Sequence, residues 1–180
     1  HRDLHSFPTR RSSDLPADDN GNSYLMFNYK TESDIKYAYL KGIRKAKKVT
    51  GADNRLSFFG SDFTNGDIGK PDIREWNYRY LGDEQILFKG KPFDCYAVES
   101  TPKTEAILRD KGYGRQVTYI EKKTLLTLKI EYFDENKIKI KEMRLLSFVS
   151  RDNVKRQKVY YYTGYEMKNV KRGTRTELLF

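Results

Sequence analysis

The sequence has few of the residues that build disulfides, metal centres and membrane spans. It contains one cysteine, Cys95, in 180 residues, so no disulfide can form within the chain and no multi-cysteine metal site is available. Its mean hydropathy is −0.84, and its apolar runs are far shorter than the roughly 18 residues that a membrane-spanning helix needs. A lone cysteine fits a cytosolic protein, or a periplasmic protein that needs no disulfide.

Histidine is missing from most of the chain. Both histidines, His1 and His5, lie within residues 1–15, a segment that resembles a sequencing adapter translated as if it were coding sequence. We therefore expect residues 1–15 to be artefactual and disordered. Without them, 32 basic and 23 acidic side chains remain, a net charge of +9 against +10 for the whole chain. The basic character thus belongs to the chain proper, and no histidine remains to activate Cys95 as a nucleophile.

What the chain does contain favours β-structure. It has 14 tyrosines and 10 phenylalanines, which suit a pleated, half-buried surface. Apolar side chains take every second position, most clearly over residues 126–132. The alternation predicts strands over residues 24–30, 34–40, 43–49, 76–81, 85–89, 93–100, 116–121, 126–132, 138–149, 159–168 and 174–180. Short turns join most of them, so we expect antiparallel pairing with one face toward water. Residues 104–111 predict a short helix or a loop tip.

One loop has residue choices that are particular to it. It reads Arg-Leu-Ser-Phe-Phe-Gly-Ser-Asp-Phe over residues 55–63 and is followed by Asp67. We expect Asp62 to cap a helical turn, Arg55 to pair with Asp62 or Asp67, and Gly60 to adopt a conformation that other residues resist. Direct contact with a ligand is the less favoured alternative to this bracing role. The predicted structural loop comprises Arg55, Ser57, Phe58, Gly60, Ser61, Asp62, Phe63 and Asp67.

Short motifs follow one another along the chain in a recognisable order. The most specific is Ser57-Phe58 with Gly60-Ser61-Asp62-Phe63. The weaker ones are Pro16-Ala17-Asp18, Tyr39-Leu40, Lys47-Lys48-Val49, Tyr80-Leu81-Gly82, Asp94-Cys95-Tyr96, Val98-Glu99, Pro102-Lys103, Tyr113 and Glu166-Met167. The series resembles the LolA-like outer-membrane lipoprotein-sorting proteins of bacterial envelopes. The chain departs from that pattern at Asn65-Gly66, where the family has an aromatic residue and an acid.

The resemblance implies both a fold and a function. The fold would be mainly β: an antiparallel, curved, incompletely closed β-barrel with few helices. Residues 16–180 would form a partial domain truncated at both ends, with N-terminal strands and a helix missing. The protein would be a non-catalytic periplasmic carrier that binds lipid acyl chains or lipoproteins for sorting to the outer membrane. Its partner would be an inner-membrane transporter, and no cofactor or metal is expected.

An acyl chain needs an apolar trough. Each buried methylene contributes about 0.8 kcal/mol, so about ten contribute on the order of 8 kcal/mol. The candidate lining residues lie on the predicted strands: Phe93, Cys95, Ala97, Val117, Tyr119, Leu126, Leu128, Ile130 and Tyr132. The same residues would also suit a plain core beneath a lid.

The sequence is also compatible with other functions. The basic residues within 41–48 would suit a solvated surface or transient contact with an anionic membrane. Charge and surface aromatics would allow a nucleic-acid-binding β-domain, but no nucleic-acid motif is present and no nucleic acid is expected. An envelope accessory protein that acts through protein–protein contact is a further alternative. A calcium site built from Asp62, Asp67 and Asp72 is conceivable, although the EF-hand spacing is absent.

Overall fold

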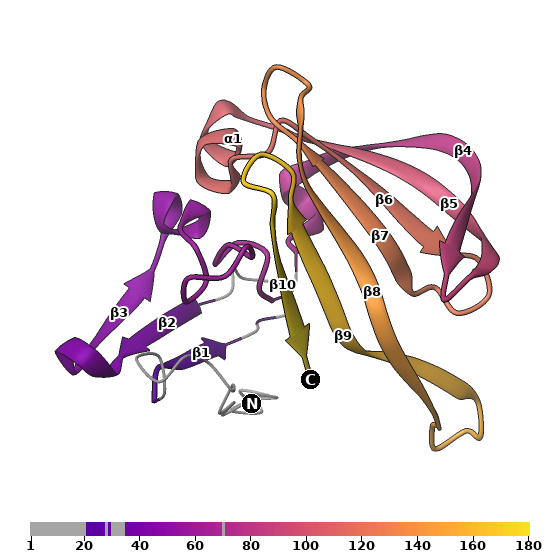
Figure 1. Ribbon diagram of the computed structural model, residues 1–180, viewed down its shortest axis with the longest axis horizontal. Helices are drawn as coiled ribbons and strands as arrows, with labels where there is room; N and C mark the ends of the chain where they lie inside the picture. Colours follow the sequence, from indigo (N-terminus) through magenta and orange to yellow (C-terminus); the bar gives the residue numbers. More distant parts are fainter. Residues whose placement is uncertain (1–20, 28, 30–34, 70) are drawn as a thin grey trace. The chain divides into compact units, whose positions relative to one another are not determined.

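The computed structural model describes residues 21–27, 29, 35–69 and 71–180 (Figure 1). The predicted adapter segment, residues 1–15, lies outside the described residues. The chain forms two compact units. The first contains residues 1–73 and 109–111, and the second contains residues 74–108 and 112–180.

The first unit contains a three-stranded antiparallel sheet in the order β1-β2-β3. Its strands are β1 (Ser23–Phe27), β2 (Ile35–Leu40) and β3 (Lys45–Val49). A 3₁₀ turn over Lys41–Ile43 joins β2 to β3, and Arg44 ends it in the left-handed conformation with a φ of 51°. This turn occupies the first residue of the strand predicted over residues 43–49.

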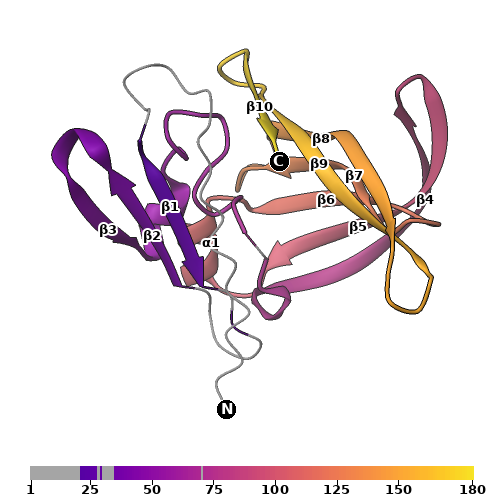
Figure 2. The ribbon, with the colours of Figure 1, turned by 90° about the horizontal axis from the view of Figure 1, so that it is seen from below.

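The second unit contains a seven-stranded antiparallel sheet in the order β10-β9-β8-β7-β6-β5-β4. Because this order follows the chain, every neighbouring pair of strands is consecutive in sequence. The strands are β4 (Trp76–Phe88), β5 (Lys91–Pro102), β6 (Arg115–Glu121), β7 (Thr127–Phe133), β8 (Lys139–Asp152), β9 (Lys158–Asn169) and β10 (Thr174–Leu179). Figures 1 and 2 show this sheet as a curved, open surface. The predicted mainly antiparallel, curved and unclosed β-fold is confirmed.

The predicted short helix is also present, as α1 (Glu105–Lys111) between β5 and β6. The Thr104 hydroxyl caps it by accepting from the backbone N–H of Ile107 at 3.3 Å. Gly112 ends it with a φ of 75°, the left-handed conformation that glycine adopts without strain.

The predicted strand break at Gly82 is wrong. Residues 76–88 form one strand, and the pairing register with β5 shifts between Tyr80 and Gly82. Gly82 has a φ of 125°, so it accommodates an extra residue as a β-bulge without ending the strand. A glycine that reads as a turn in sequence is here a bend within a long edge strand.

The sheet curls strongly at the end formed by the β4–β5 hairpin. The ring of Phe88 on β4 lies 5.8 Å from the ring of Phe148 on β8, although three strands separate β4 from β8 in the sheet. A buried apolar cluster fills the curl, and we call it the curl core: Cys95, Leu126, Leu128 and Leu145, with Ile86, Phe88, Phe93, Tyr119, Phe148, Tyr160 and Tyr165 packed against them.

Gly114 marks a close backbone approach. A Cβ at this position would lie 2.7 Å from the carbonyl oxygen of Asp134, a backbone atom that cannot rotate away. We expect Gly114→Ala to lower the free energy of unfolding by about 1–3 kcal/mol, measured by urea denaturation followed by circular dichroism. Gly42→Ala is the control, because a Cβ at Gly42 meets nothing within 4 Å. Equal losses in the two variants would contradict the close approach.

Candidate functional site

One face of the seven-stranded sheet carries a dense array of charged residues. Directly opposed residues of neighbouring strands point to the same face, so the pairing register identifies its rows. The first row comprises Ala97, Tyr119, Lys129, Arg144 and Glu166. The second row comprises Glu99, Val117, Glu131, Glu142 and Lys168. We call this the network face, because most of its side chains are joined by ion pairs.

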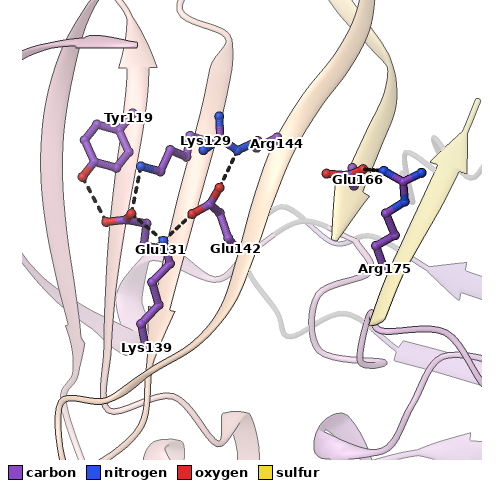
Figure 3. A network of polar contacts seen from close by, with 8 residues as sticks. All are labelled: Tyr119, Lys129, Glu131, Lys139, Glu142, Arg144, Glu166 and Arg175. Atoms are coloured by element: carbon purple, nitrogen blue, oxygen red, sulfur yellow. Dashed lines mark hydrogen bonds and ion pairs between the residues drawn. The ribbon is translucent and has the colours of Figure 1, made fainter. Parts of the chain in front are cut away.

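Glu131 lies at the centre of these ion pairs (Figure 3). One of its carboxylate oxygens, Oε1, lies 2.8 Å from Lys129 Nζ and 2.8 Å from Lys139 Nζ. Its other oxygen accepts a hydrogen bond from the Tyr119 hydroxyl at 3.1 Å. Lys139 also donates to Glu142, which accepts from Arg144 as well. The network therefore ties β6, β7 and β8 together across the face.

Glu131 stays ionised and Tyr119 stays neutral over the ordinary pH range. Desolvation by burial acts to raise the pKa of Glu131, but hydrogen bonds and charges from Lys129 and Lys139 outweigh it and lower the pKa to about 2. Burial, together with the neighbouring Glu131 carboxylate, raises the pKa of Tyr119 to about 12. These side chains are thus held in fixed charge states by one another.

Toward the β4–β5 hairpin the same face carries more apolar residues, beside the carboxylates of Glu84 and Glu121. Cys95 lies opposite Glu121, and Phe93 lies opposite Ile86. Here the pairing of β6 with β7 shifts register, so that Leu128 is an additional residue on β7. This β-bulge interrupts the alternation, and Leu128 joins Cys95 in the curl core.

A pocket of about 300 Å³ lies where the apolar and charged zones meet. Its lining residues come from the end of β4 and from β7, β8 and β9: Leu87, Phe88, Lys89, Leu128, Arg144, Leu145, Leu146 and Glu166. Lys89 is exposed and lies over the Phe88 ring, 5.5 Å from its centroid. The pocket therefore offers an apolar wall with cations beside it.

The loop over residues 55–67 is held by its own hydrogen bonds within the first unit. Ser57 Oγ donates to the carbonyl oxygen of Ser61 at 2.6 Å, and Ser61 Oγ donates to that of Phe58 at 2.6 Å. Phe59 and Gly60 turn the chain with φ angles of 46° and 76°. The Phe58 ring packs edge-on against Tyr24 at 5.1 Å.

Residues 64–67 of this loop form a single turn, and the partner of Arg55 differs from the sequence-based expectation. In the turn, the backbone N–H of Asp67 donates to the carbonyl oxygen of Thr64 at 3.0 Å, and the Asp67 carboxylate accepts from the backbone N–H of Thr64 at 2.7 Å. The hydrogen bond of Arg55 goes to the carbonyl oxygen of Arg109 at 3.5 Å, in place of the predicted ion pair with Asp62 or Asp67.

The chain departs from the family pattern at Asn65-Gly66, and both residues form hydrogen bonds that hold the loop. Asn65 Nδ2 donates to the carbonyl oxygen of Asp53 at 3.0 Å, and the backbone N–H of Gly66 donates to that of Asn54 at 2.9 Å. A Cβ at Gly66 would lie 3.1 Å from the same Asn54 oxygen. A small residue at position 66 lets the loop sit against residues 53–54.

Comparison with known proteins identifies the fold. A family model described as "-like: Uncharacterized protein" matches residues 13–180. An outer-membrane lipoprotein-sorting protein domain from Vibrio parahaemolyticus has a TM-score of 0.74 at 23% identity, over 92% of this chain and 66% of its own. A LolA superfamily protein from Nitrosomonas europaea has a TM-score of 0.59 at 19% identity, over 92% of this chain and 66% of its own. The chain belongs to the family of that model, and it has a LolA-like fold.

A further structure extends the comparison. A DUF1329 family protein from Desulfovibrio piger matches this LolA-like chain with a TM-score of 0.74 at 29% identity, over 91% of this chain and 65% of its own. The chain thus spans about two thirds of the length of the solved chains it matches. No curated protein sequence matches it.

The structure divides the nine predicted lining residues of the LolA-like chain between the two sides of the sheet. Phe93, Cys95, Ala97, Val117 and Tyr119 share the network face, and Leu126 and Leu128 join Cys95 in the curl core. Ile130 and Tyr132 lie opposite Met143 and Lys141, between network residues, so they point to the other side. Tyr132 packs there against Tyr113, with ring centroids 4.7 Å apart.

Of the nine predicted residues, only Leu128 lines the pocket. The pocket residues that sequence reasoning missed are Leu87, Phe88, Lys89, Arg144, Leu145, Leu146 and Glu166. Four of these residues form two pairs of adjacent apolar residues, at 87–88 and 145–146. Such pairs depart from the alternation expected of a strand, and this departure is the signal that would have drawn attention to them.

Cys95 is fully buried. Burial is the main cause that raises the pKa of its thiol to about 11, whereas a nucleophilic cysteine needs a lowered pKa. Among the described residues, no cluster of three or more His, Cys, Asp or Glu side chains could hold a metal ion. In the same part of the chain, no helix is long and apolar enough to cross a membrane.

The network predicts a pH-dependent contribution to stability. Glu131 has a folded pKa of about 2 against about 4.3 unfolded, so its contribution is complete above pH 4.3 and is lost as the pH falls toward 2. We expect Glu131→Gln to lower the free energy of unfolding at neutral pH by about 1–3 kcal/mol. The deficit should shrink as the pH falls through that window.

The matched control is Glu135→Gln, which replaces an exposed carboxylate in the β7–β8 turn. Urea denaturation at neutral pH and at successively lower pH measures both variants. A Glu131→Gln deficit that is absent at neutral pH, or that grows in acid, would contradict the stabilising role of the network.

Proposed function

We propose that this LolA-like chain is a non-catalytic periplasmic carrier that binds lipid acyl chains or lipoproteins for sorting to the outer membrane. The observation that carries the proposal is the pocket between the curl core and the network face. It combines five apolar side chains with two cations and one carboxylate. An amphiphile, with an apolar chain and a polar head, complements such a lining.

The size of the pocket sets what part of a lipid it would hold. Its volume of about 300 Å³ lies at the small end of the range of roughly 300–1,000 Å³ that is usual for ligand pockets. The pocket would therefore bury a segment of an acyl chain rather than a whole diacyl lipid. Each methylene taken from water would contribute about 0.8 kcal/mol.

The same arithmetic supports a transporter partner. Burial of an acyl chain is favourable when the chain comes from water, but a chain that leaves a bilayer is already out of water. The free energy for extraction must then come from another protein. An inner-membrane transporter that hands cargo to this chain is the partner that the proposal requires.

The burial and raised pKa of Cys95 also favour a carrier over a thiol-dependent enzyme.

The proposal is tested by fatty-acid binding to the 180-residue chain. Leu87 lines the pocket and is 67% exposed, so Leu87→Asp can place a charge against the acyl chain without opening the core. We expect this variant to weaken the binding of a fluorescent fatty acid by at least about tenfold, equivalent to 1.4 kcal/mol. Fluorescence titration measures the affinity.

Val154→Asp provides the matched control. Val154 is fully exposed in the β8–β9 turn and is not among the pocket residues, so the same chemical change there should leave affinity unaltered. Failure of the unsubstituted chain to bind any fatty acid would overturn the carrier proposal. Equal weakening by both variants would show that the pocket is not the binding site.

A further inference from the structure

The tip of the β2–β3 hairpin combines exposed aliphatic side chains with a run of cations. Ile43 is 61% exposed and Leu40 is 37% exposed. Five basic residues lie on the turn and the strand that follows it: Lys41, Arg44, Lys45, Lys47 and Lys48. No acidic residue lies within residues 41–48. We call residues 40–48 the basic tip.

Most of the positive charge at the basic tip is uncompensated. Lys47 pairs with Asp53 at 2.7 Å. Within the described part of the chain, no ion pair involves Lys41, Arg44, Lys45 or Lys48. All four are exposed. An anionic surface would therefore meet four available cations within eight consecutive positions.

Hydrogen bonds of the backbone hold the turn of the basic tip. The backbone N–H of Arg44 donates to the carbonyl oxygen of Lys41 at 3.1 Å. The backbone N–H of Lys41 donates to the side-chain oxygen of Asn22 at 3.0 Å. The charges thus extend from a structured turn, which reduces the ordering cost of binding.

Tyrosines lie on one face of the same sheet, and Leu40 and Lys45, which pair with each other, lie on its other face. Lys48 on β3 lies opposite Tyr37 on β2, which lies opposite Leu25 on β1, so the three share one face. Tyr39 lies two residues from Tyr37 on the same face and is 37% exposed. Tyrosine next to lysine and aliphatic side chains is the composition found at the headgroup level of membranes.

We propose that the basic tip docks this chain on an anionic lipid surface, with Leu40 and Ile43 entering the headgroup region. This inference deepens the proposed function, on which it rests for its biological role, by assigning the residues that contact the membrane. Leu40 and Ile43 favour lipid over nucleic acid, because a single-stranded nucleic acid gains from aromatic rings that stack on bases, and Tyr39 lies on the face opposite Leu40. Hydrocarbon gains directly from Leu and Ile.

The test is sedimentation of the 180-residue chain with lipid vesicles. Phosphatidylcholine vesicles that contain phosphatidylglycerol should bind the chain at least about tenfold more tightly than pure phosphatidylcholine vesicles, and added salt should weaken the binding. Replacement of Lys41, Arg44 and Lys45 by Gln should weaken binding to the anionic vesicles by at least about tenfold, since each cation near the surface contributes.

A control with the same charge change separates the basic tip from net charge. The control variant has Gln in place of Lys155, Arg156 and Lys158, which lie in and beside the exposed β8–β9 turn. It should change vesicle binding less than about twofold. Ile43→Gln leaves the charge unaltered and should still weaken vesicle binding by several-fold. Equal losses in the two triple variants, or no effect of Ile43→Gln, would overturn the assignment.

Two further outcomes decide between partners and between proposals. Tighter binding to a single-stranded oligonucleotide than to the anionic vesicles, at the same salt concentration, would overturn the membrane assignment. Leu87→Asp should retain full vesicle binding, because the pocket takes no part in it. If the unsubstituted chain bound fatty acid but not the anionic vesicles, only the basic-tip assignment would be refuted. If it bound the vesicles but no fatty acid, only the carrier proposal would be refuted.

Discussion

The site depends on one constraint, the curl that brings Phe88 of β4 against Phe148 of β8 across three intervening strands. A flat sheet would hold these rings far apart, since neighbouring strands are separated by about 4.8 Å. The curl encloses the buried cluster around Cys95 and Leu128. It also places the end of β4 beside Arg144 and Glu166, which creates the pocket. Without the curl, the same residues would line an open surface.

Charge distribution sets the limits of the apolar surface. The face that carries Cys95 and Phe93 at one end carries Glu131, Lys129 and Arg144 further along. Half-buried ions of this kind are tolerated because Glu131 and Glu142 each contact two or more donors. The network therefore stabilises the register of β6, β7 and β8 while it restricts the apolar zone to the hairpin end. A carrier with this face would bind an amphiphile at the boundary rather than along the whole sheet.

The sequence predicted the strands well and their faces less well. Alternation over residues 126–132 located β7, and the same reasoning located the other strands of the seven-stranded sheet. Alternation cannot register a β-bulge, and the one beside Tyr119 shifts the relation of Leu128 to its neighbours. For that reason Ile130 and Tyr132 were grouped with residues of the opposite face. The strand end predicted at Gly82 was wrong for a similar reason, because the sequence does not distinguish a glycine within a β-bulge from a glycine in a turn.

The motif over residues 55–63 pointed to the LolA-like fold, but it did not predict which atoms its side chains contact. Residues 55–67 form a loop in the first unit that is held by hydrogen bonds between its own residues. All the residues that line the pocket belong to the second unit. Arg55 and Asp67 bond to backbone groups, partners that no pattern of side chains reveals. The pocket depends on non-local contacts between β4 and β8, which lie sixty residues apart in sequence. Only the fold brings such residues together.

The most direct test of the account is the position of a bound acyl chain. A fatty acid with a spin label on its chain, added to leucine-methyl-labelled protein, broadens the NMR signals of nearby methyl groups. The account predicts broadening at Leu87, Leu128, Leu145 and Leu146 that is stronger than at Leu108 in α1, which is not among the pocket residues. Broadening spread evenly over the exposed leucines, or absent from these four, would contradict the claim that the curl of the sheet creates the lipid site.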